Sequence, residues 1–285
     1  MKIKKAITVL MSCLFAGALL TGCGGTDTGA NTGGQSPKIK LGMITHLNAN
    51  ESKMEEILQK AQETTEVNIL KYGITYYENL HLMQMAIESN SVDQISLYNS
   101  VADYVIASNN KYEKIKDNSL NHLNDSFCFA VRKDDTQLKT DLDNAIKTMK
   151  DNGTLDSLVD KYITNVDKDN LPKVDIPMIE GADTIKIGIT GDLPPLDLTL
   201  ADNSPAGFNT ALLAEIAKNL GKNIEIVQID SGARAAALAA QKIDVIFWAV
   251  LPNGEKVPKD IDKPEEVEFT VPYFQDNVAH LKVSK

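Results

Sequence analysis

Residues 185–227 have the sequence IKIGITGDLPPLDLTLADNSPAGFNTALLAEIAKNLGKNIEIV, and this stretch decides the fold class. Its two ends, 185–189 and 224–229, are short apolar runs that predict buried strands. Between them lie a turn at 191–195 and the segment 208–220, whose apolar residues recur at helical spacing until Gly221 ends the helix. A strand–helix–strand order predicts parallel strands covered by a helix.

The alternation of strands and helices extends in both directions from this stretch. Downstream we expect a helix at 233–240 and strands at 245–250 and 278–283. Upstream we expect strands at 39–44, 67–72, 94–98 and 127–133, with helices at 80–87, from Ser100, from Leu138 and from Thr154. Residues 165–183 contain Pro172, Pro177 and Gly181 and predict an extended connector. The chain is therefore expected to be an α/β protein.

The first residues have the three parts of a secretory leader: early lysines, an apolar run at 6–20 that is short for a bilayer span, and a cut site. Leu20-Thr21-Gly22-Cys23 is the pattern cut before a cysteine that receives lipid. We expect residues 1–22 to be removed and Cys23 to hold the protein at the extracellular face of the cell membrane. Residues 23–37, rich in Gly, Thr and Asn, predict a flexible tether. An ordinary leader with an incidental Cys23 is the alternative.

Composition excludes several classes of function. The net charge is −10, which argues against a nucleic-acid partner because phosphates require basic patches. After export and lipidation only Cys128 remains as a thiol, so stability must come from a packed core. The four histidines lack metal-ligand spacing and no catalytic triad is recognisable, so we expect no metal, no cofactor and no enzyme activity.

The second half resembles the beginning of the extracellular solute-binding protein family 3, which serves polar amino-acid ABC transporters. The resemblance is carried by the segment quoted above, by ALAAQKIDVIF at 237–247 and by VEFTVPYF at 267–274. The first half resembles the end of the same family, through MQMAIESNSVDQISLYNSVADYVIASN at 83–109 and FAVRKDDTQLKTDLDNAIKTMKDNGTLDSLVDKYI at 129–163. This implies a two-lobed periplasmic-binding-protein type 2 fold with a mixed sheet in each lobe.

The swapped order of the halves predicts a circular permutation joined through 165–183. The alternative, two truncated copies in tandem, would leave large apolar faces exposed. The permutation predicts lobe two from 38–123 plus 277–285 and lobe one from 129–273, which includes the connector. Hinges are expected near 124–128 and 274–277, so closure on a ligand would be retained.

Ligands of open α/β sheets bind beyond the carboxyl ends of the strands. Arg234, one of two arginines, could clamp a carboxylate or could be a solvated helix residue. Trp248 could form a stacking wall or pack in the core, and Asp192 could pair with an ammonium or only form a turn. The candidate ligand-binding residues are Arg234, Asp192, Trp248, Thr45, Tyr98, Ser231 and His46.

The sequence departs from the family where its members bind an amino acid. No arginine is present in 250–256, where the resemblance implies one for the α-carboxylate. The ammonium-binding aspartate aligns with Tyr98, and the stacking aromatic aligns with Ser231. We expect a substrate-binding lipoprotein of an ABC uptake system, a monomer that passes a small polar, carboxylate-bearing solute to a permease. A ligand-sensing surface receptor and a cleft enzyme are the alternatives.

Overall fold

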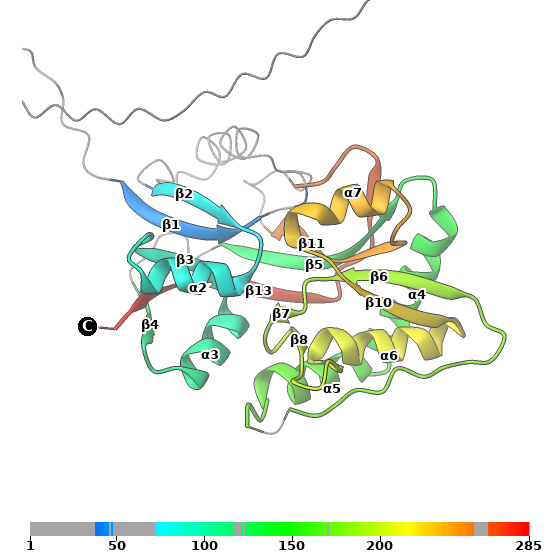
Figure 1. The fold of residues 1–285 in the computed structure, drawn as a ribbon. Helices are drawn as coiled ribbons and strands as arrows, with labels where there is room; N and C mark the ends of the chain where they lie inside the picture. Colours follow the sequence, from blue (N-terminus) through cyan, green and yellow to red (C-terminus); the bar gives the residue numbers. More distant parts are fainter. Residues whose placement is uncertain are drawn as a thin grey trace, which may run out of the picture. The chain divides into compact units, whose positions relative to one another are not determined.

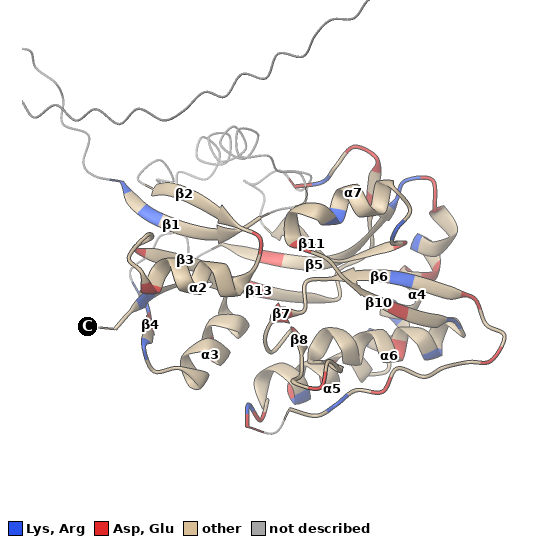
Figure 2. Cartoon of the chain, viewed as in Figure 1, with Lys and Arg blue, Asp and Glu red and all other residues tan. Residues whose placement is uncertain are grey.

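The chain alternates strands and helices, as the apolar pattern predicted (Figure 1). The computed structural model describes residues 38–45, 47, 72–116, 121, 123–169, 171–253 and 262–284. The predicted leader, Cys23, the tether and His46 lie outside these residues. Figure 2 shows Lys and Arg dispersed along the described chain and mixed with Asp and Glu.

One set of strands is built around residues 185–227. β6 (Thr184–Ile189) is flanked by β10 (Asn223–Gln228) and β11 (Val245–Asn253), all parallel. β5 (Asn124–Arg132) pairs antiparallel with β11, and β12 (Val267–Phe269) pairs antiparallel with β5. The order β10-β6-β11-β5-β12 is called the β6 sheet below.

A second set of strands repeats the same plan. β1 (Ile39–Ile44) lies between β2 (Tyr72–Tyr77) and β3 (Gln94–Tyr98), again all parallel. β13 (Phe274–Val283) pairs antiparallel with β3, and the short β4 (Tyr112–Lys114) pairs antiparallel with β13. This order, β2-β1-β3-β13-β4, is called the β1 sheet. The two sheets therefore have the same strand order and the same directions.

The two sheets are joined by β5 and β13. β13 pairs with β5 over residues 274–277 and with β3 over residues 278–281, so that the described strands form one ten-stranded sheet. In the shared part, Phe274 faces Phe127 and Asn277 faces Asn124. The segments predicted as hinges thus lie side by side in an antiparallel ribbon, although they are far apart in the sequence.

The helices pack on both faces of the β6 sheet, with α7 on one face and α5 and α6 on the other (Figure 1). None of the helices in the described ranges combines the length and apolarity needed to span a bilayer. The helices are α2 (Leu80–Glu88), α3 (Asn99–Ser108), α4 (Thr136–Asp151), α5 (Thr154–Val159), α6 (Phe208–Leu220) and α7 (Arg234–Ala239), with a π turn at Asp160–Thr164 and a 3-10 turn at Ser231–Ala233.

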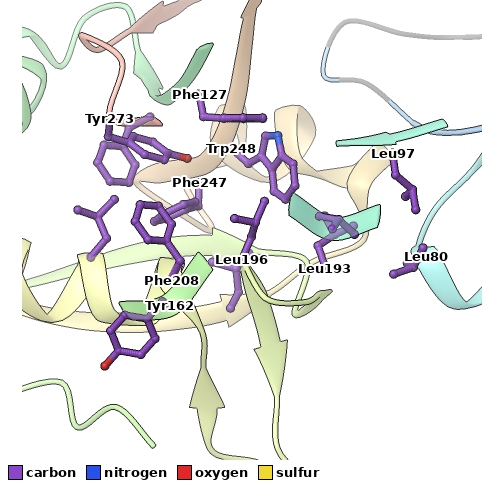
Figure 3. Packing of buried hydrophobic residues seen from close by; sticks show 14 of the residues in the cluster. Leu80, Leu97, Phe127, Tyr162, Leu193, Leu196, Phe208, Phe247, Trp248 and Tyr273 are labelled. Carbon is purple, nitrogen blue, oxygen red and sulfur yellow. The ribbon is translucent and has the colours of Figure 1, made fainter. Parts of the chain in front are cut away.

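Successive side chains of β5 belong to two hydrophobic clusters, one on each face of the β6 sheet. Phe127 and Phe129 belong to the large cluster that contains residues of α4, α5 and α6, whereas Cys128 and Ala130 pack with α7. Successive side chains of a strand point to opposite faces, which explains the division. The large cluster extends from Leu80 of α2 and Leu97 of the β1 sheet to the aromatic residues of the β6 sheet (Figure 3). One core therefore supports both sheets.

The loop between β6 and α6 holds a small sheet that the sequence did not predict. It contains β7 (Asp192–Leu193), β8 (Asp197–Thr199) and β9 (Pro205–Ala206). The first amides of α6 bind this loop, because Phe208 N–H donates to the Pro195 carbonyl at 3.1 Å. Residue 207 before the helix has φ of +91°, a conformation that glycine adopts readily.

Several predicted boundaries were displaced. The strand predicted at 67–72 is β2, Tyr72–Tyr77, and residues 67–71 lie outside the described part. Residues 74–77 are β-branched or aromatic, the types that favour strands, and β2 pairs with the whole length of β1. The helix expected from Ser100 begins at Asn99, and the strand expected at 127–133 is β5, which begins earlier because it pairs with β13.

Candidate functional site

The loops that follow the parallel strands of the two sheets contact each other. After β2, the backbone carbonyl of Glu78 accepts a hydrogen bond from Ser231 N–H at 3.4 Å. The side chain of Glu78 accepts one from Gly232 N–H through Oε2 at 2.8 Å. Ser231 is buried, while Glu78 and Gly232 are exposed. A carboxylate of the β1 sheet therefore binds a backbone amide of the β6 sheet at the rim of this contact.

In a second contact the carboxylate comes from the β6 sheet and the amide from α2, which follows β2. Asp192, at the start of β7, accepts a hydrogen bond from Leu80 N–H through Oδ2 at 2.6 Å. Leu80 is the first residue of α2, and Asn79 caps the same helix by accepting from Leu82 N–H at 2.9 Å. A carboxylate at a helix N-terminus is favourable because the free amides and the helix dipole are positive there.

Asp192 keeps one oxygen available beside a cavity. Its Oδ1 is buried and has no hydrogen-bond partner among the described residues, and burial is the main cause that raises the pKa of the carboxyl. The cavity has a volume of about 200 Å³. It is lined by Leu80, His81, Gln84, Tyr104, Val105, Ser108, Asn109, Asp192 and Pro194.

Arg234 is 6% exposed, which excludes the alternative of a solvated helix arginine. Its Nε donates to the Ser231 carbonyl at 3.0 Å, and Nη1 donates to the carbonyls of Trp248 at 2.8 Å and Phe247 at 3.5 Å. Nη2 donates to the Thr45 carbonyl of the β1 sheet at 3.5 Å. Burial lowers the pKa of the guanidinium, which nevertheless stays charged at neutral pH. Arg234 thus joins the turn before α7, strand β11 and the loop after β1 through their main chains.

Trp248 lies at a bulge in β11 and is packed in the core, where its ring also contacts the other sheet. The register of β11 against β5 shifts between Ile246 and Ala249, and Trp248 has φ of +69°, which is uncommon for a bulky residue. Its ring is 5.0 Å from Phe127 in an edge contact and 5.7 Å from Tyr98 of the β1 sheet. Trp248 is therefore packed in the core and at the same time forms a wall against the other sheet (Figure 3).

Tyr98 reaches carboxylates of the β5–β13 ribbon. Its hydroxyl donates to Asp125 Oδ2 at 2.8 Å, and burial followed by this carboxylate raises the pKa of the phenol well above its usual value. Asp276, which faces Asp125 across the ribbon, accepts from Ser100 N–H at 2.8 Å. Burial raises the pKa of Asp276 as well. Where the family resemblance implies an aspartate, a hydroxyl therefore binds one carboxylate of the ribbon, that of Asp125.

Asp197 is a buried residue that shapes the loop after β6. Its Oδ2 accepts hydrogen bonds from Thr190 N–H at 3.0 Å, from Thr190 Oγ1 at 3.2 Å and from Gly191 N–H at 2.8 Å. Burial, opposed by these bonds, raises the pKa of the carboxyl to about 6. This network fixes the backbone that presents Asp192.

Arg234 contacts Ser231, Trp248 and the Thr45 carbonyl, and Trp248 contacts Tyr98. Asp192 instead binds the amide of Leu80, and His46 lies outside the described residues. Glu78 was not among the predicted site residues. The strand before it was predicted to end at residue 72, whereas β2 ends at Tyr77. With the correct end, the rule that ligands bind beyond strand ends would have selected residue 78. In the described ranges, no group of three His, Cys, Asp or Glu side chains could hold a metal ion.

Comparison with known proteins identifies the family. The sequence model of the bacterial extracellular solute-binding proteins, family 3, matches residues 43–165 and 185–285, which is most of the 285 residues. The chain belongs to this family. The predicted α/β, periplasmic-binding-protein type 2 fold is therefore confirmed. The unmatched stretch between the two segments coincides with the predicted connector.

The similar proteins cover parts of the chain. A probable histidine-binding protein of Campylobacter jejuni is 31% identical over 100 residues, 35% of this chain and 36% of that protein. An arginine-binding extracellular protein of Bacillus subtilis is 27% identical over 105 residues, 37% of each chain. The chain thus spans little more than a third of the length of these curated relatives.

Among solved structures, the GluR0 ligand-binding core from Nostoc punctiforme in complex with L-glutamate has a TM-score of 0.37 at 9% identity, covering 87% of this chain and 85% of that one. A putative L-cystine ABC transporter from Listeria monocytogenes has a TM-score of 0.38 at 11% identity, covering 88% and 84%.

Proposed function

We propose that the protein is the substrate-binding lipoprotein of an ABC uptake system and captures a small polar, carboxylate-bearing solute between two closing lobes. Cys23 anchors it by lipid at the extracellular face of the cell membrane, and it passes the solute as a monomer to a permease. Lobe two comprises 38–123 plus 277–285, and lobe one comprises 129–273. Membership of an extracellular solute-binding family supports this function, as do relatives named for binding histidine and arginine.

The observation that carries the proposal is that the loop after β10 already binds a carboxylate. Gly232 N–H donates to Glu78 Oε2, and the buried charge of Arg234 attracts the same side chain. An amide donor beside a guanidinium is a suitable environment for the carboxylate of a solute. The solute carboxylate would take the position of Glu78 in this proposal.

Arg234 takes part through the donor that faces lobe two. Nη2 donates to the Thr45 carbonyl at 3.5 Å, longer than the bonds of Nε to Ser231 and of Nη1 to Trp248. Separation of the lobes would break this long bond first, leaving Nη2 directed at the cleft while the other bonds hold the guanidinium. The bidentate clamp expected from the sequence is thereby reduced to one donor aided by loop amides.

Asp192 supplies the site for a solute ammonium. Its buried Oδ1 lacks a partner among the described residues, and an unpaired buried carboxylate oxygen is unfavourable until a donor reaches it. The adjacent cavity of about 200 Å³ can admit a small group. An amino acid or a related amino-bearing metabolite satisfies both Asp192 and the loop that now binds Glu78.

The strand order supports a circular permutation. β1 begins and β13 ends at the same end of the β1 sheet, on either side of β3, because Leu41 faces Gln94 and Leu281 faces Ile95. Neighbouring strands lie about 4.8 Å apart, so these ends are on the order of 10 Å apart, and a short loop would join them. Joining them and cutting the connector 165–183 restores a chain that completes each lobe in the order implied by the family resemblance.

A thermal-shift screen of amino acids, dicarboxylates and other small metabolites tests the function. A solute at about 100 times its dissociation constant should stabilise the protein by about 2.7 kcal/mol. Arg234→Lys and Asp192→Asn should each reduce the shift, whereas Asp93→Asn, remote from the loops described above, should not. A screen in which no small solute raises the melting temperature would contradict the receptor function.

A further inference from the structure

Two carboxylates cross between the sheets in opposite directions. Glu78, just before α2, reaches the amide of Gly232 just before α7. Asp192 of the β6 sheet reaches the amide of Leu80 at the start of α2. Each sheet therefore offers a carboxylate to a turn at a helix start of the other. These bonds are made by groups of the protein itself, so they hold the two sheets together without any contribution from a solute.

Gly232 lies very close to the Glu78 carboxylate. A Cβ atom at this position would lie 2.9 Å from Oε2 and 3.0 Å from Oε1 of Glu78, distances that real Cβ atoms rarely show. The backbone there forms a 3-10 turn without positive φ, so its conformation does not require glycine. A Cβ at 232 would therefore require the Glu78 carboxylate, the end of an exposed side chain, to move away.

The hydrogen bond between Glu78 and Gly232 can break and form again readily. Glu78 is exposed, so water can replace Gly232 as its partner at little expense in free energy. The bond between Asp192 and Leu80 is part-buried and shorter, and it repeats the favourable pairing of a carboxylate with a helix N-terminus. One contact is therefore readily exchanged while the other persists.

We propose that Glu78 is an internal ligand which, together with Asp192, latches the two lobes in the closed arrangement before a solute binds. The latch rests on the proposed function, since its purpose is to yield the Gly232 amide to a solute carboxylate. The solute then replaces Glu78 and does not have to bring two separated lobes together. Glu78 thereby sets a threshold: solutes that bind the loop more weakly than Glu78 are rejected.

Three variants of the purified protein and one control test the latch. Glu78→Ala removes the carboxylate, Glu78→Gln keeps an oxygen acceptor but removes its charge, and Gly232→Ala displaces the carboxylate by steric contact. The control is Gly73→Ala, where the nearest atoms to a new Cβ are those of Lys38, at 3.7 Å or more. Circular dichroism establishes that each variant is folded.

Closure is measured without any solute, so failure of the latch and failure of the proposed function are distinguishable. Trp248 is the single tryptophan and packs against Tyr98 of lobe two, so separation of the lobes should expose it. Acrylamide quenching and the emission maximum of Trp248 report this exposure, and small-angle X-ray scattering gives the radius of gyration.

The wild type and Gly73→Ala should show a shielded tryptophan and a small radius of gyration. Glu78→Ala and Gly232→Ala should show stronger quenching, a red-shifted emission maximum and a larger radius, with Glu78→Gln between them. Folded Glu78→Ala and Gly232→Ala proteins that match the wild type in both measurements would overturn the latch. So would a wild type as open as these variants. A negative solute screen with open latch variants would instead contradict only the transport function.

Discussion

Replacement of Arg234 by methionine should destabilise the folded protein even though methionine fills much of the same space. The guanidinium is 6% exposed and donates to the carbonyls of Ser231 and Trp248 at 3.0 and 2.8 Å. In the Arg234→Met variant these two carbonyls lose a charged donor inside the protein. The bulge at Trp248 also loses the group that binds its main chain.

The size of the effect follows from these two bonds. A hydrogen bond to a charged group contributes about 1.5–3 kcal/mol, so two of them contribute about 3–6 kcal/mol. The two bonds of 3.5 Å add little, because they are long. Burial of the charge is itself unfavourable, as the lowered pKa of Arg234 indicates, and removal of the charge offsets part of the loss. We therefore expect the free energy of unfolding to fall by about 2–4 kcal/mol.

Urea denaturation followed by circular dichroism measures this change, with the denaturant slope used to establish that the transition stays two-state. Arg234→Lys provides the matched control: it keeps the charge, but a single ammonium on a shorter side chain cannot bind both carbonyls, so its loss should be intermediate. A loss below about 1 kcal/mol in Arg234→Met would refute the reasoning, since that is the contribution of one ordinary hydrogen bond.

Two further predictions concern the loop after β6. Burial raises the pKa of Asp197 from 3.8 to about 6, so the folded state binds this proton more tightly than the unfolded chain does. The contribution of Asp197 to the free energy of unfolding should therefore fall by about 2 kcal/mol as pH rises from about 4 to about 6, and Asp197→Asn should remove this part of the pH dependence measured by urea titration. An unchanged slope would show that burial does not control this carboxyl. Gly207→Ala should lower stability by about 3 kcal/mol or more, because φ is +91° and its Cβ would lie 2.6 Å from the Pro195 carbonyl oxygen. Gly73→Ala should stay within about 0.5 kcal/mol of the wild type, and equal melting temperatures for both variants would contradict the explanation.

Much of the candidate site was predictable because ligands bind beyond strand ends, and strand ends can be predicted from a few neighbouring residues. Asp192, Ser231 and Arg234 follow strands that the apolar pattern predicted, and ligands bind beyond such strand ends, whereas Trp248 lies inside β11. Glu78 follows a strand whose boundary was displaced, so the same rule missed it. Its partner Gly232 lies in the loop after β10 that the rule selects, but the sequence could not show that Gly232 binds a carboxylate 154 positions away.

The sequence by itself determined the helix Phe208–Leu220 and the strands β6, β10 and β11, because apolar periodicity and helix stop signals act over a few neighbouring residues. It also determined the family, through the resemblance carried by residues 185–227, 237–247 and 267–274. Only the tertiary structure decided that β13 changes partners from β5 to β3, that Arg234 is buried among carbonyls and that Glu78 binds across the sheets. These features depend on strand register and on close approach between distant segments. Local propensity has no information about either, because the pairing energy appears only when the chain is folded.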